Sequence, residues 1–230
     1  MKSIFITGTD TEVGKTHVSS ILIKYIKQFQ KAVTGFKPIA AGAERAFGEL
    51  VNEDALSLME SGNVALPYKL INPYVFEPPI APHIAAKQEG VTITKAALSQ
   101  HLNVLDQQEL DHLIVEGAGG WALPINDSDL LSEWVADEEL PVIMVVGLKL
   151  GCLNHALLTL SHIKQSGAKC VGWIANYVDA HMLEQDENLA TLKARLDCPL
   201  LAIAPNTQNE KPKLQVYKEL NTALKLDNLI

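Results

Sequence analysis

Short apolar runs alternate with longer amphipathic stretches along the chain. Most of the short runs are β-branched and are bounded by Gly, Pro or polar residues, as strands buried on both faces are. Such runs predict strands. The predicted strands are Ile4–Thr7, Val33–Lys37, His112–Glu116, Val142–Val146, Cys170–Ala175 and Leu200–Ala204.

The longer stretches repeat apolar residues with the spacing of one helix face. The three predicted faces are Val18, Ile21, Leu22, Tyr25, Ile26 and Phe29; Leu98, Leu102 and Leu105; and Leu153, Leu157, Leu160 and Ile163. Helices that connect successive strands demand crossovers, which favour parallel pairing. We therefore predict an α/β fold with a mostly parallel central sheet of about six to seven strands and helices on both faces.

The segment 39–82 breaks this alternation because it is rich in Gly and Pro. It contains one predicted helix, near Asn52–Glu60. A connection of this length is too long for a plain loop in a compact domain. The pattern indicates either an active-site excursion or a mobile lid.

Composition narrows the function classes. The chain has 230 residues, 47% of them hydrophobic, and a formal net charge of −8, which argues against a nucleic-acid surface. Its three cysteines form no CxxC or Cys/His cluster, so we expect free thiols in a reducing compartment rather than zinc ligands. The N-terminus reaches a glycine motif too soon for a signal peptide, and no apolar stretch is long enough to span a membrane. We therefore expect a cytoplasmic protein.

The most informative motif is Gly8-Thr9-Asp10-Thr11-Glu12-Val13-Gly14-Lys15-Thr16, which joins a predicted strand to a predicted helix. Consecutive backbone N–H groups and the helix N-terminus can bind polyphosphate in this context. Lys15 can reach the β- and γ-phosphates, and Thr16 can hold Mg²⁺. Five residues, not four, separate Gly8 from Gly14, so the loop is a variant. The sequence thus predicts one P-loop α/β domain over residues 1–230.

Acidic residues make this loop unusual. Partition-type ATPases have a lysine where this chain has Asp10, and glycines where it has Thr11 and Glu12. A carboxylate so close to phosphate would be repulsive unless it points away or meets another group. We interpret Glu12 as a ligand of the substrate or the ribose rather than of phosphate.

Charged residues also follow other predicted strands. Glu116 ends one strand and precedes Gly117-Ala118-Gly119-Gly120, a run that lets the backbone approach a ligand. Its carboxylate suits Mg²⁺, and Asp54 is either a third metal ligand or a helix first-turn acid. Lys37 ends another predicted strand, and Pro38 fixes the chain direction after it. The Lys37 side chain either points over the phosphate-binding loop or is a solvated lysine at a strand end. Asn176 follows a strand at a position that commonly meets the nucleotide base.

Several blocks in this order resemble the dethiobiotin synthetase family along almost the whole chain. They are the loop from Thr7 to Thr16, Gly35-Phe36-Lys37-Pro38-Ile39-Ala40, Asn52-Glu53-Asp54-Ala55, Asn72-Pro73-Tyr74, Pro82-His83, Val115-Glu116-Gly117-Ala118-Gly119-Gly120-Trp121, and the block from Leu140 to His155. This chain differs from the family pattern at three positions. Ala41 replaces a hydroxyl residue that is common in the family, Ala81 replaces a serine, and Tyr177 replaces an aspartate.

The resemblance implies an ATP- and Mg²⁺-dependent cyclo-ligase. In that reaction 7,8-diaminononanoate takes up carbon dioxide as a carbamate, which attacks the γ-phosphate of ATP. The second amine then closes the ureido ring of dethiobiotin as phosphate leaves. The resemblance assigns catalysis to Lys37 and Lys15, and Mg²⁺ to Thr16, Asp54 and Glu116.

The resemblance also implies binding residues. The expected nucleotide-binding residues are Glu12, Val13, Gly14, Lys15, Thr16, His17, Asp54, Glu116, Gly117, Ala118, Gly119, Asn176, Tyr177, Pro205, Asn206, Thr207 and Glu210. Substrate contacts are expected at Thr11, Lys37 and Ala41. The resemblance implies a homodimer in which Gly151, Cys152 and Leu153, at a predicted helix start, bind the substrate carboxylate from the partner.

Two other function classes are open. Corrinoid amide-forming ligases share the predicted fold, but they need a glutaminase domain, for which we expect 230 residues to leave no room. A nucleotide-dependent switch of the GTPase or partition type would need a guanine-reading lysine or a second loop lysine. Tyr177 and Asp10 occupy those two positions.

Overall fold

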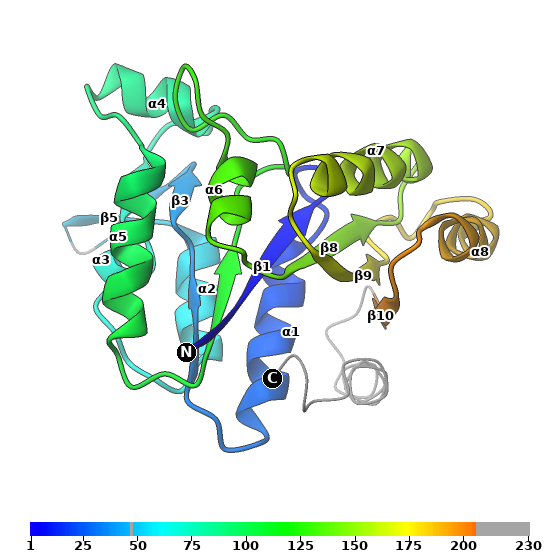
Figure 1. Cartoon of the computed structure of the whole chain (residues 1–230), viewed down its shortest axis with the longest axis horizontal. Helices are drawn as coiled ribbons and strands as arrows, with labels where there is room; N and C mark the ends of the chain where they lie inside the picture. Colours follow the sequence, from blue (N-terminus) through cyan, green and yellow to red (C-terminus); the bar gives the residue numbers. More distant parts are fainter. Residues whose placement is uncertain (47, 206–230) are drawn as a thin grey trace.

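A six-stranded sheet forms the centre of the computed structural model, which describes residues 1–46 and 48–205 (Figure 1). The strand order is β10-β9-β8-β1-β7-β2, and every neighbouring pair is parallel. The six predicted strands are confirmed with small shifts at their ends. Their bounds are β1 Lys2–Gly8, β2 Val33–Phe36, β7 His112–Glu116, β8 Val142–Gly147, β9 Cys170–Asn176 and β10 Leu200–Ala204.

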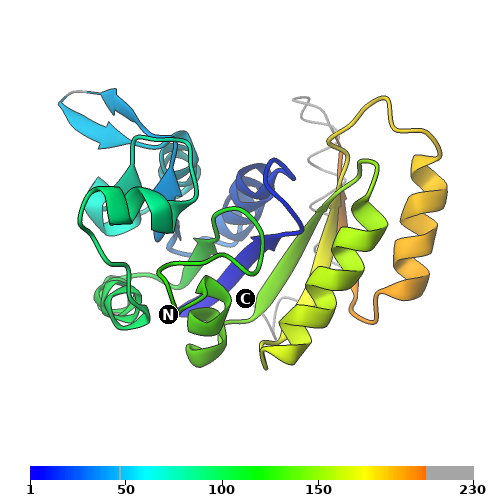
Figure 2. The ribbon, with the colours of Figure 1, turned by 90° about the horizontal axis from the view of Figure 1, so that it is seen from above.

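Helices cover both faces of the sheet, as predicted (Figure 2). One face packs on α1 (Lys15–Lys27) and α2 (Glu53–Ser61). The other packs on α5 (Lys95–Asp106), α6 (Leu131–Asp137), α7 (Cys152–Gln165) and α8 (Gln185–Arg195). Side chains alternate between the two cores along β1: Ile4 and Ile6 join the first, and Phe5 joins the second.

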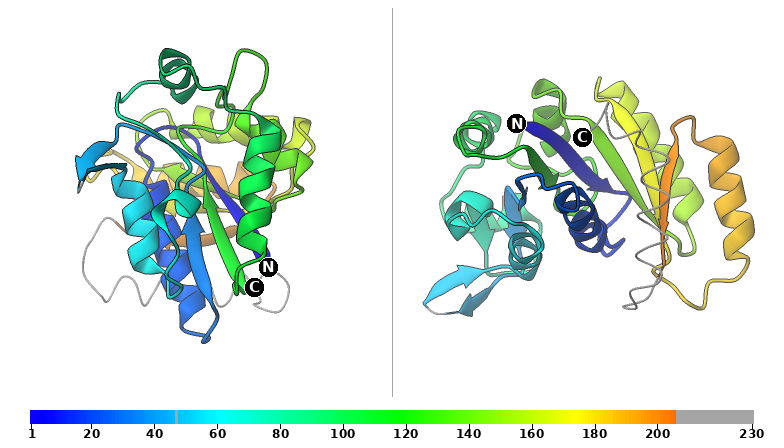
Figure 3. Two further views of the ribbon diagram at one scale, coloured as in Figure 1. Left: turned by 90° about the vertical axis from the view of Figure 1, so that its left-hand side faces the viewer. Right: turned by 90° about the horizontal axis from the view of Figure 1, so that it is seen from below.

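The segment 39–82 forms a folded excursion beyond β2. β3 (Ile39–Ala41) pairs in parallel with β6 (Tyr74–Phe76), while β4 (Glu44–Ala46) and β5 (Glu49–Val51) form an antiparallel hairpin that projects from one side of the molecule (Figure 3). α2 follows β5 along the chain, and the short helix α3 (Tyr68–Ile71) precedes β6. The predicted helix near Asn52–Glu60 is confirmed as α2.

Several elements were not predicted from the sequence. β3 to β6, α3, α4 (Pro82–Gln88) and α6 are too short to show a period. α8 is long enough, but only Leu189 and Leu192 are buried along it. Its sequence therefore shows no apolar stripe wide enough to predict a helix.

Two predicted helix faces are wrong in part. α1 ends at Lys27, so Phe29 lies beyond the helix and is exposed. The buried face of α7 is Cys152, Ala156, Leu160 and Ile163. Leu157 is exposed, together with Leu150 (93%) and Leu158 (62%). Among the described residues, none of the helices has the length and apolar character needed to cross a membrane.

A glycine in β2 sets the distance between α2 and the sheet. A Cβ atom added at Gly35 would lie 2.6 Å from Cβ of Leu58, which is fully buried in α2. Real Cβ atoms do not approach so closely, so any side chain here must push α2 outwards. Because Asp54 lies in the first turn of α2, this contact also positions a candidate site residue.

We expect Gly35→Ala to lower the free energy of unfolding by about 1–3 kcal/mol, because overpacking shifts a close-packed helix. Urea unfolding followed by circular dichroism measures this change. The matched control is Gly120→Ala, whose added Cβ would meet only the Gly8 carbonyl oxygen, at 3.8 Å. Equal stability of the Gly35 variant and the wild type would contradict the packing argument.

Candidate active site at the phosphate-binding loop

A cavity of about 830 Å³ opens at the carboxyl ends of β1, β2 and β7. Ligands bind at this edge in open parallel sheets. The lining combines the glycine loop, the end of β2, the start of α2 and the run after β7. The lining residues are Thr11, Glu12, Gly14, Lys15, Thr16, Lys37, Ala40, Ala41, Asn52, Asp54, Pro79, Ile80, Ala81, Pro82, Ala118, Gly119, Gly120 and Leu123.

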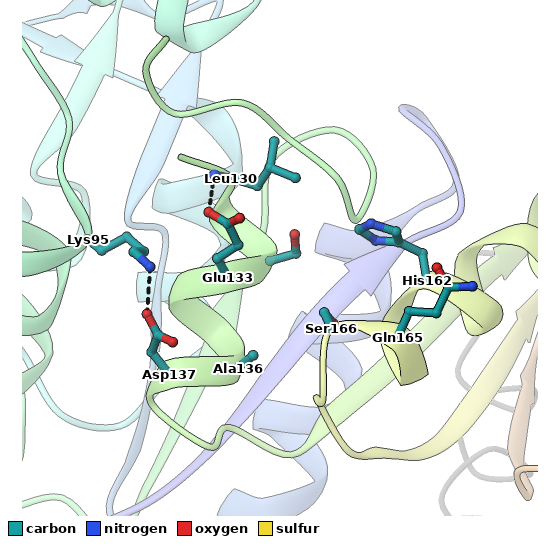
Figure 4. A pocket seen from close by; sticks show the side chains of 9 residues that line it. Lys95, Leu130, Glu133, Ala136, Asp137, His162, Gln165 and Ser166 are labelled. Atoms are coloured by element: carbon teal, nitrogen blue, oxygen red, sulfur yellow. Dashed lines mark hydrogen bonds and ion pairs between the residues drawn. The ribbon is translucent and has the colours of Figure 1, made fainter. Parts of the chain in front are cut away.

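A second cavity, of about 410 Å³, lies between α5, α6 and α7 (Figure 4). Its charged groups already have partners. Lys95 Nζ lies 2.7 Å from Asp137 Oδ2, and Glu133 Oε2 accepts a hydrogen bond of 2.9 Å from the Leu130 N–H. No glycine loop contributes to this lining. The cavity at the carboxyl edge is therefore the better candidate for an active site.

The backbone of the glycine loop has the conformation of an anion-binding turn. Glu12 and Gly14 both adopt left-handed conformations, with φ of 58° and 83°. Alternating left- and right-handed residues before a helix create a concave nest for anions. A Cβ atom at Gly14 would lie 2.0 Å from Asn176 Nδ2, so only glycine fits there. α1 begins directly after this residue and adds its partial positive charge.

Lys15 lies buried at the base of the nest. Its Nζ donates to the Asp10 carbonyl oxygen at 3.1 Å. Burial, followed by the nearby Lys37 ammonium group, lowers the pKa of Lys15 to about 8. A polyphosphate in the cavity would oppose both effects, because it brings negative charge to the ammonium group.

A compact polar cluster lies beside Lys15. Thr16 Oγ1 lies 2.7 Å from Asp54 Oδ1 and 2.9 Å from Glu116 Oε1. Lys37 Nζ lies 2.7 Å from the same Glu116 oxygen and 3.2 Å from Asp54 Oδ2, and it donates to the Gly117 carbonyl at 3.0 Å. The structure thus brings together residues from α1, β7, α2 and the end of β2.

Electrostatics keep this cluster charged. Burial alone would lower the pKa of Lys37, but the carboxylates of Glu116 and Asp54 raise it above its usual value. Burial also opposes ionisation of Asp54, yet Lys37 and the Thr16 hydroxyl together hold the Asp54 pKa below its usual value. Lys37 therefore remains an ammonium group beside the ionised Asp54 carboxylate.

The oxygen groups of this cluster fit a magnesium ion. Thr16, Asp54 and Glu116 supply a hydroxyl and two carboxylates, which are the hard ligands Mg²⁺ prefers. Glu116 Oε2 is buried and has no hydrogen-bond partner, so it is an acceptor in need of a cation or a donor. The described residues hold no group of three His, Cys, Asp or Glu side chains suited to a metal. Phosphate oxygens would have to complete the coordination.

A hydrogen-bond chain through the excursion holds Asp54 beside Lys37. The Asn52 side chain caps α2 by accepting from the Asp54 N–H at 3.1 Å. The Tyr68 hydroxyl accepts from the Asn52 N–H and donates to Asn72 Oδ1, both at 2.8 Å. Asn72 Nδ2 donates to the Lys37 carbonyl at 2.7 Å. Sequence reasoning assigned no role to Asn52, Tyr68 or Asn72, because their partners are distant along the chain.

The acidic residue in the loop does have a partner. Lys149 Nζ lies 2.9 Å from Asp10 Oδ2, and the Thr11 N–H donates to Asp10 Oδ1 at 2.8 Å. Hydrogen bonding to Lys149 lowers the pKa of Asp10. The repulsion expected from the sequence is thus offset by a lysine in the turn after β8. A carboxylate in a phosphate loop is itself a signal that such a cation is needed.

Asn176 lies at the carboxyl end of the sheet, where it was expected, and its side chain contacts the glycine loop. It is the last residue of β9, it is buried, and its Nδ2 donates to the Val13 carbonyl at 2.9 Å. Its side-chain amide therefore holds the glycine loop in place.

Other expected nucleotide-binding residues follow the last two strands. Tyr177 is half-buried against the core, and Pro205 follows β10 at the same end of the sheet. Asn206, Thr207 and Glu210 lie outside the described residues.

The expected substrate residues fall into two groups. Thr11, Lys37 and Ala41 line the cavity. Gly151, Cys152 and Leu153 form the start of α7 and are absent from that lining.

Two expected nucleotide-binding residues lie near the loop but outside the lining. Val13 is fully buried, so only its backbone can reach a nucleotide, and His17 lies on the exposed side of the first turn of α1.

The fold and this loop define a P-loop nucleotide-binding protein. Residues 2–213 match the family described as an AAA domain. The chain is 57% identical over 220 residues to the ATP-dependent dethiobiotin synthetase BioD of Pseudoalteromonas translucida, covering 96% of each protein. It is 44% identical to that of Vibrio cholerae, covering 99% of this chain and 96% of the relative. The chain belongs to the family of ATP-dependent dethiobiotin synthetases.

Solved structures with low sequence identity share the fold alone. The MinD cell division protein of Aquifex aeolicus superimposes with a TM-score of 0.62 at 13% identity, covering 98% of each chain. A cobyrinic acid a,c-diamide synthase from Mycobacterium smegmatis gives 0.59 at 14% identity, covering 97% of this chain and 94% of that one. These likenesses confirm the predicted P-loop α/β architecture.

We expect Lys149→Ala to weaken binding of a magnesium–ATP analogue by about fivefold, because roughly 1 kcal/mol of repulsion from unpaired Asp10 would act on the phosphates. Isothermal titration calorimetry measures the affinity. The double variant Asp10→Asn/Lys149→Ala removes the charge and should recover binding. Lys164→Ala breaks the ion pair with Asp197 instead and is the matched control. Unchanged affinity in Lys149→Ala would contradict the role of the pair.

Proposed function

We propose that this chain catalyses ATP- and Mg²⁺-dependent closure of the ureido ring of dethiobiotin from 7,8-diaminononanoate and carbon dioxide, as its family membership implies. One observation carries the proposal. In a chain 57% identical to a dethiobiotin synthetase, the buried Lys37 ammonium group lies within 3.2 Å of carboxylates from α2 and β7, beside the phosphate loop. We also propose that residues 1–230 act as one P-loop domain.

The reaction needs positive charge and orientation more than a nucleophilic side chain. A carbamate oxygen attacks the γ-phosphorus, ADP leaves, and the product is a carbamic–phosphoric anhydride. The second amine attacks the carbonyl carbon, the ring closes, and phosphate leaves. The protein must stabilise the transferring phosphoryl group and hold the diamine in line with it.

The site's own groups suit these tasks. Lys15 and the N–H groups of the loop would bind the β- and γ-phosphates, and Lys37 would face the transferred group. Thr16, Asp54 and Glu116 would hold Mg²⁺, which neutralises phosphate charge when bound. Thr11 and Ala41 line the same cavity and would face the diamine. Glu12, also at this lining, would contact the nucleotide.

We further propose a homodimer in which the start of α7 serves the partner's site. Gly151, Cys152 and Leu153 would bind the substrate carboxylate at the helix start, whose partial positive charge favours anions. Two observations support this proposal: the same segment is absent from the cavity of its own chain, and Leu150 and Leu158 beside it are largely exposed. Exposed leucines in α7 and in the turn before it favour burial against another surface.

The activity is tested by coupling phosphate release to product formation. With ATP, diaminononanoate and bicarbonate together, we expect one phosphate released for each dethiobiotin formed. With ATP alone we expect no turnover. Turnover without the diamine would instead favour a nucleotide-dependent switch, the alternative function that the shared fold leaves open.

We predict that Lys15→Gln and Lys37→Gln each reduce kcat by about 10²–10³-fold, since one charged donor to a transition state contributes about 2.7–4 kcal/mol. Gln retains a donor for the buried carboxylates, so the fold should persist, as circular dichroism can verify. Lys37→Ala tests the same point but leaves Glu116 buried without its cation. Near-normal kcat in folded Lys37→Gln would remove that residue from catalysis.

Subunit mixing tests the shared site. Gly151→Asp places a carboxylate against the substrate's own, and Gly151→Asn is the uncharged control, because both residues tolerate the left-handed backbone at this position (φ 94°). Each mixed dimer of Lys37→Gln and Gly151→Asp protomers would contain one intact site. An equal mixture should therefore recover about one quarter of wild-type activity. No recovery after verified subunit exchange would mean that each site is built within one chain.

A further inference from the structure

Two cysteines face each other at the amino ends of β9 and β10, the end of the sheet opposite the phosphate loop. Cys170 is the first residue of β9, and Cys198 lies two residues before the start of β10. Their Sγ atoms are 3.8 Å apart, and both side chains are partly exposed. A hydrogen bond of 2.9 Å from the Trp173 N–H to the Pro199 carbonyl holds the two strand starts together.

The two sulfur atoms already lie close to bonding distance. Parallel pairing of β9 with β10 holds the two strand starts side by side and brings both thiols to one place. A disulfide needs an Sγ–Sγ distance of about 2.0 Å, so the sulfurs must approach by roughly 1.8 Å. Rotation of two partly exposed side chains can supply that movement.

We propose that Cys170 and Cys198 form a reversible thiol–disulfide site that reacts with small disulfide oxidants independently of the nucleotide cavity. P-loop chemistry uses the carboxyl ends of the parallel strands, whereas both thiols lie at the amino ends. Neither cysteine lines the phosphate-loop cavity. The site is therefore separate from the proposed ligase reaction.

The structure indicates which thiol reacts first. Cys170 donates its S–H toward Cys198, and this hydrogen bond lowers the pKa of Cys198. Burial and the neighbouring Asp197 carboxylate raise the Cys198 pKa, and Lys164 lowers it, but the hydrogen bond from Cys170 is the largest effect and keeps this pKa below its usual value. The same pairing, together with burial, raises the pKa of Cys170. A thiolate is the reactive form, so Cys198 is the entry point.

The exchange proceeds in two balanced steps. The Cys198 thiolate attacks one sulfur of the external disulfide, forming a mixed disulfide and releasing one small thiolate. Cys170 then loses its proton, attacks Cys198 Sγ and displaces the second small thiol. Two protein thiols are oxidised, and one external disulfide is reduced to two thiols. A reducing thiol reverses both steps.

Cys152 supplies an internal contrast. It is buried at the start of α7, and burial raises its pKa. No other described cysteine lies within hydrogen-bonding range of it, whereas Cys170 and Cys198 have each other. We therefore expect Cys152 to remain reduced under conditions that oxidise the pair.

Oxidation would close a loop that contains β9 and α8. The bond would tie the start of β9 to the residues just before β10. Cross-links restrict the unfolded chain, so the oxidised protein should unfold at a higher temperature than the reduced one. The phosphate loop, at the other edge, should retain its affinity for nucleotide.

The test is incubation of the full-length reduced protein with oxidised glutathione, followed by thiol counting and mass spectrometry. We expect wild type to lose two of its three thiols without retaining glutathione. Trypsin cleaves at Lys193 and Arg195, between the two cysteines, so the two cysteine peptides should remain joined until a reducing agent is added. Cys152→Ser, the matched control, should form the same cross-link.

Single variants separate the two steps. Cys170→Ser should trap glutathione on Cys198, because the displacing thiol is absent. Cys198→Ser should react more slowly than wild type, because burial still raises the pKa of the remaining Cys170 thiol. Both variants should keep wild-type ligase kcat. Retention of all three thiols in wild type, or a bond involving Cys152, would overturn the proposal.

Discussion

The buried ion pair between Lys37 and Glu116 is the contact on which the site depends. Lys37 is 3% exposed and Glu116 is fully buried, so removing either group would leave an uncompensated charge in the interior. The pair joins the ends of β2 and β7, and its neighbours Thr16 and Asp54 bring α1 and α2 to the same point. Phosphate loop, sheet and excursion are therefore fixed relative to one another by one cluster of charges.

The same cluster explains how an acidic chain can present a site for polyphosphate. Net charge is −8, yet the cavity gathers Lys15, Lys37 and the N–H groups of the loop. The acidic groups nearby are neutralised locally: Asp10 by Lys149, and Glu116 by Lys37. Local pairing, rather than overall charge, decides which ligand the cavity accepts.

Sequence patterns predicted the six-stranded sheet, the glycine loop and the expected positions of Lys37 and Glu116, because buried strands and P-loops have strong local signatures. Asp54 remained ambiguous, since a first-turn helix acid looks the same wherever the helix packs. Its place depends on Asn52, Tyr68 and Asn72, which meet only through tertiary contacts. Asn176 lies at the expected end of the sheet, and its hydrogen bond to the loop backbone joins residues too far apart along the chain for the sequence to show it.

The parallel sheet also separates two kinds of chemistry. All carboxyl ends lie at one edge, so the helix N-termini and glycine turns that bind phosphate gather there. The amino ends carry no such requirement, and the Cys170–Cys198 pair lies at that edge. β9 reaches both edges: Asn176 at its end supports the phosphate loop, and Cys170 at its start faces β10. A rigid strand buried along most of its length can hold both groups without either disturbing the other, because close packing resists displacement along the strand.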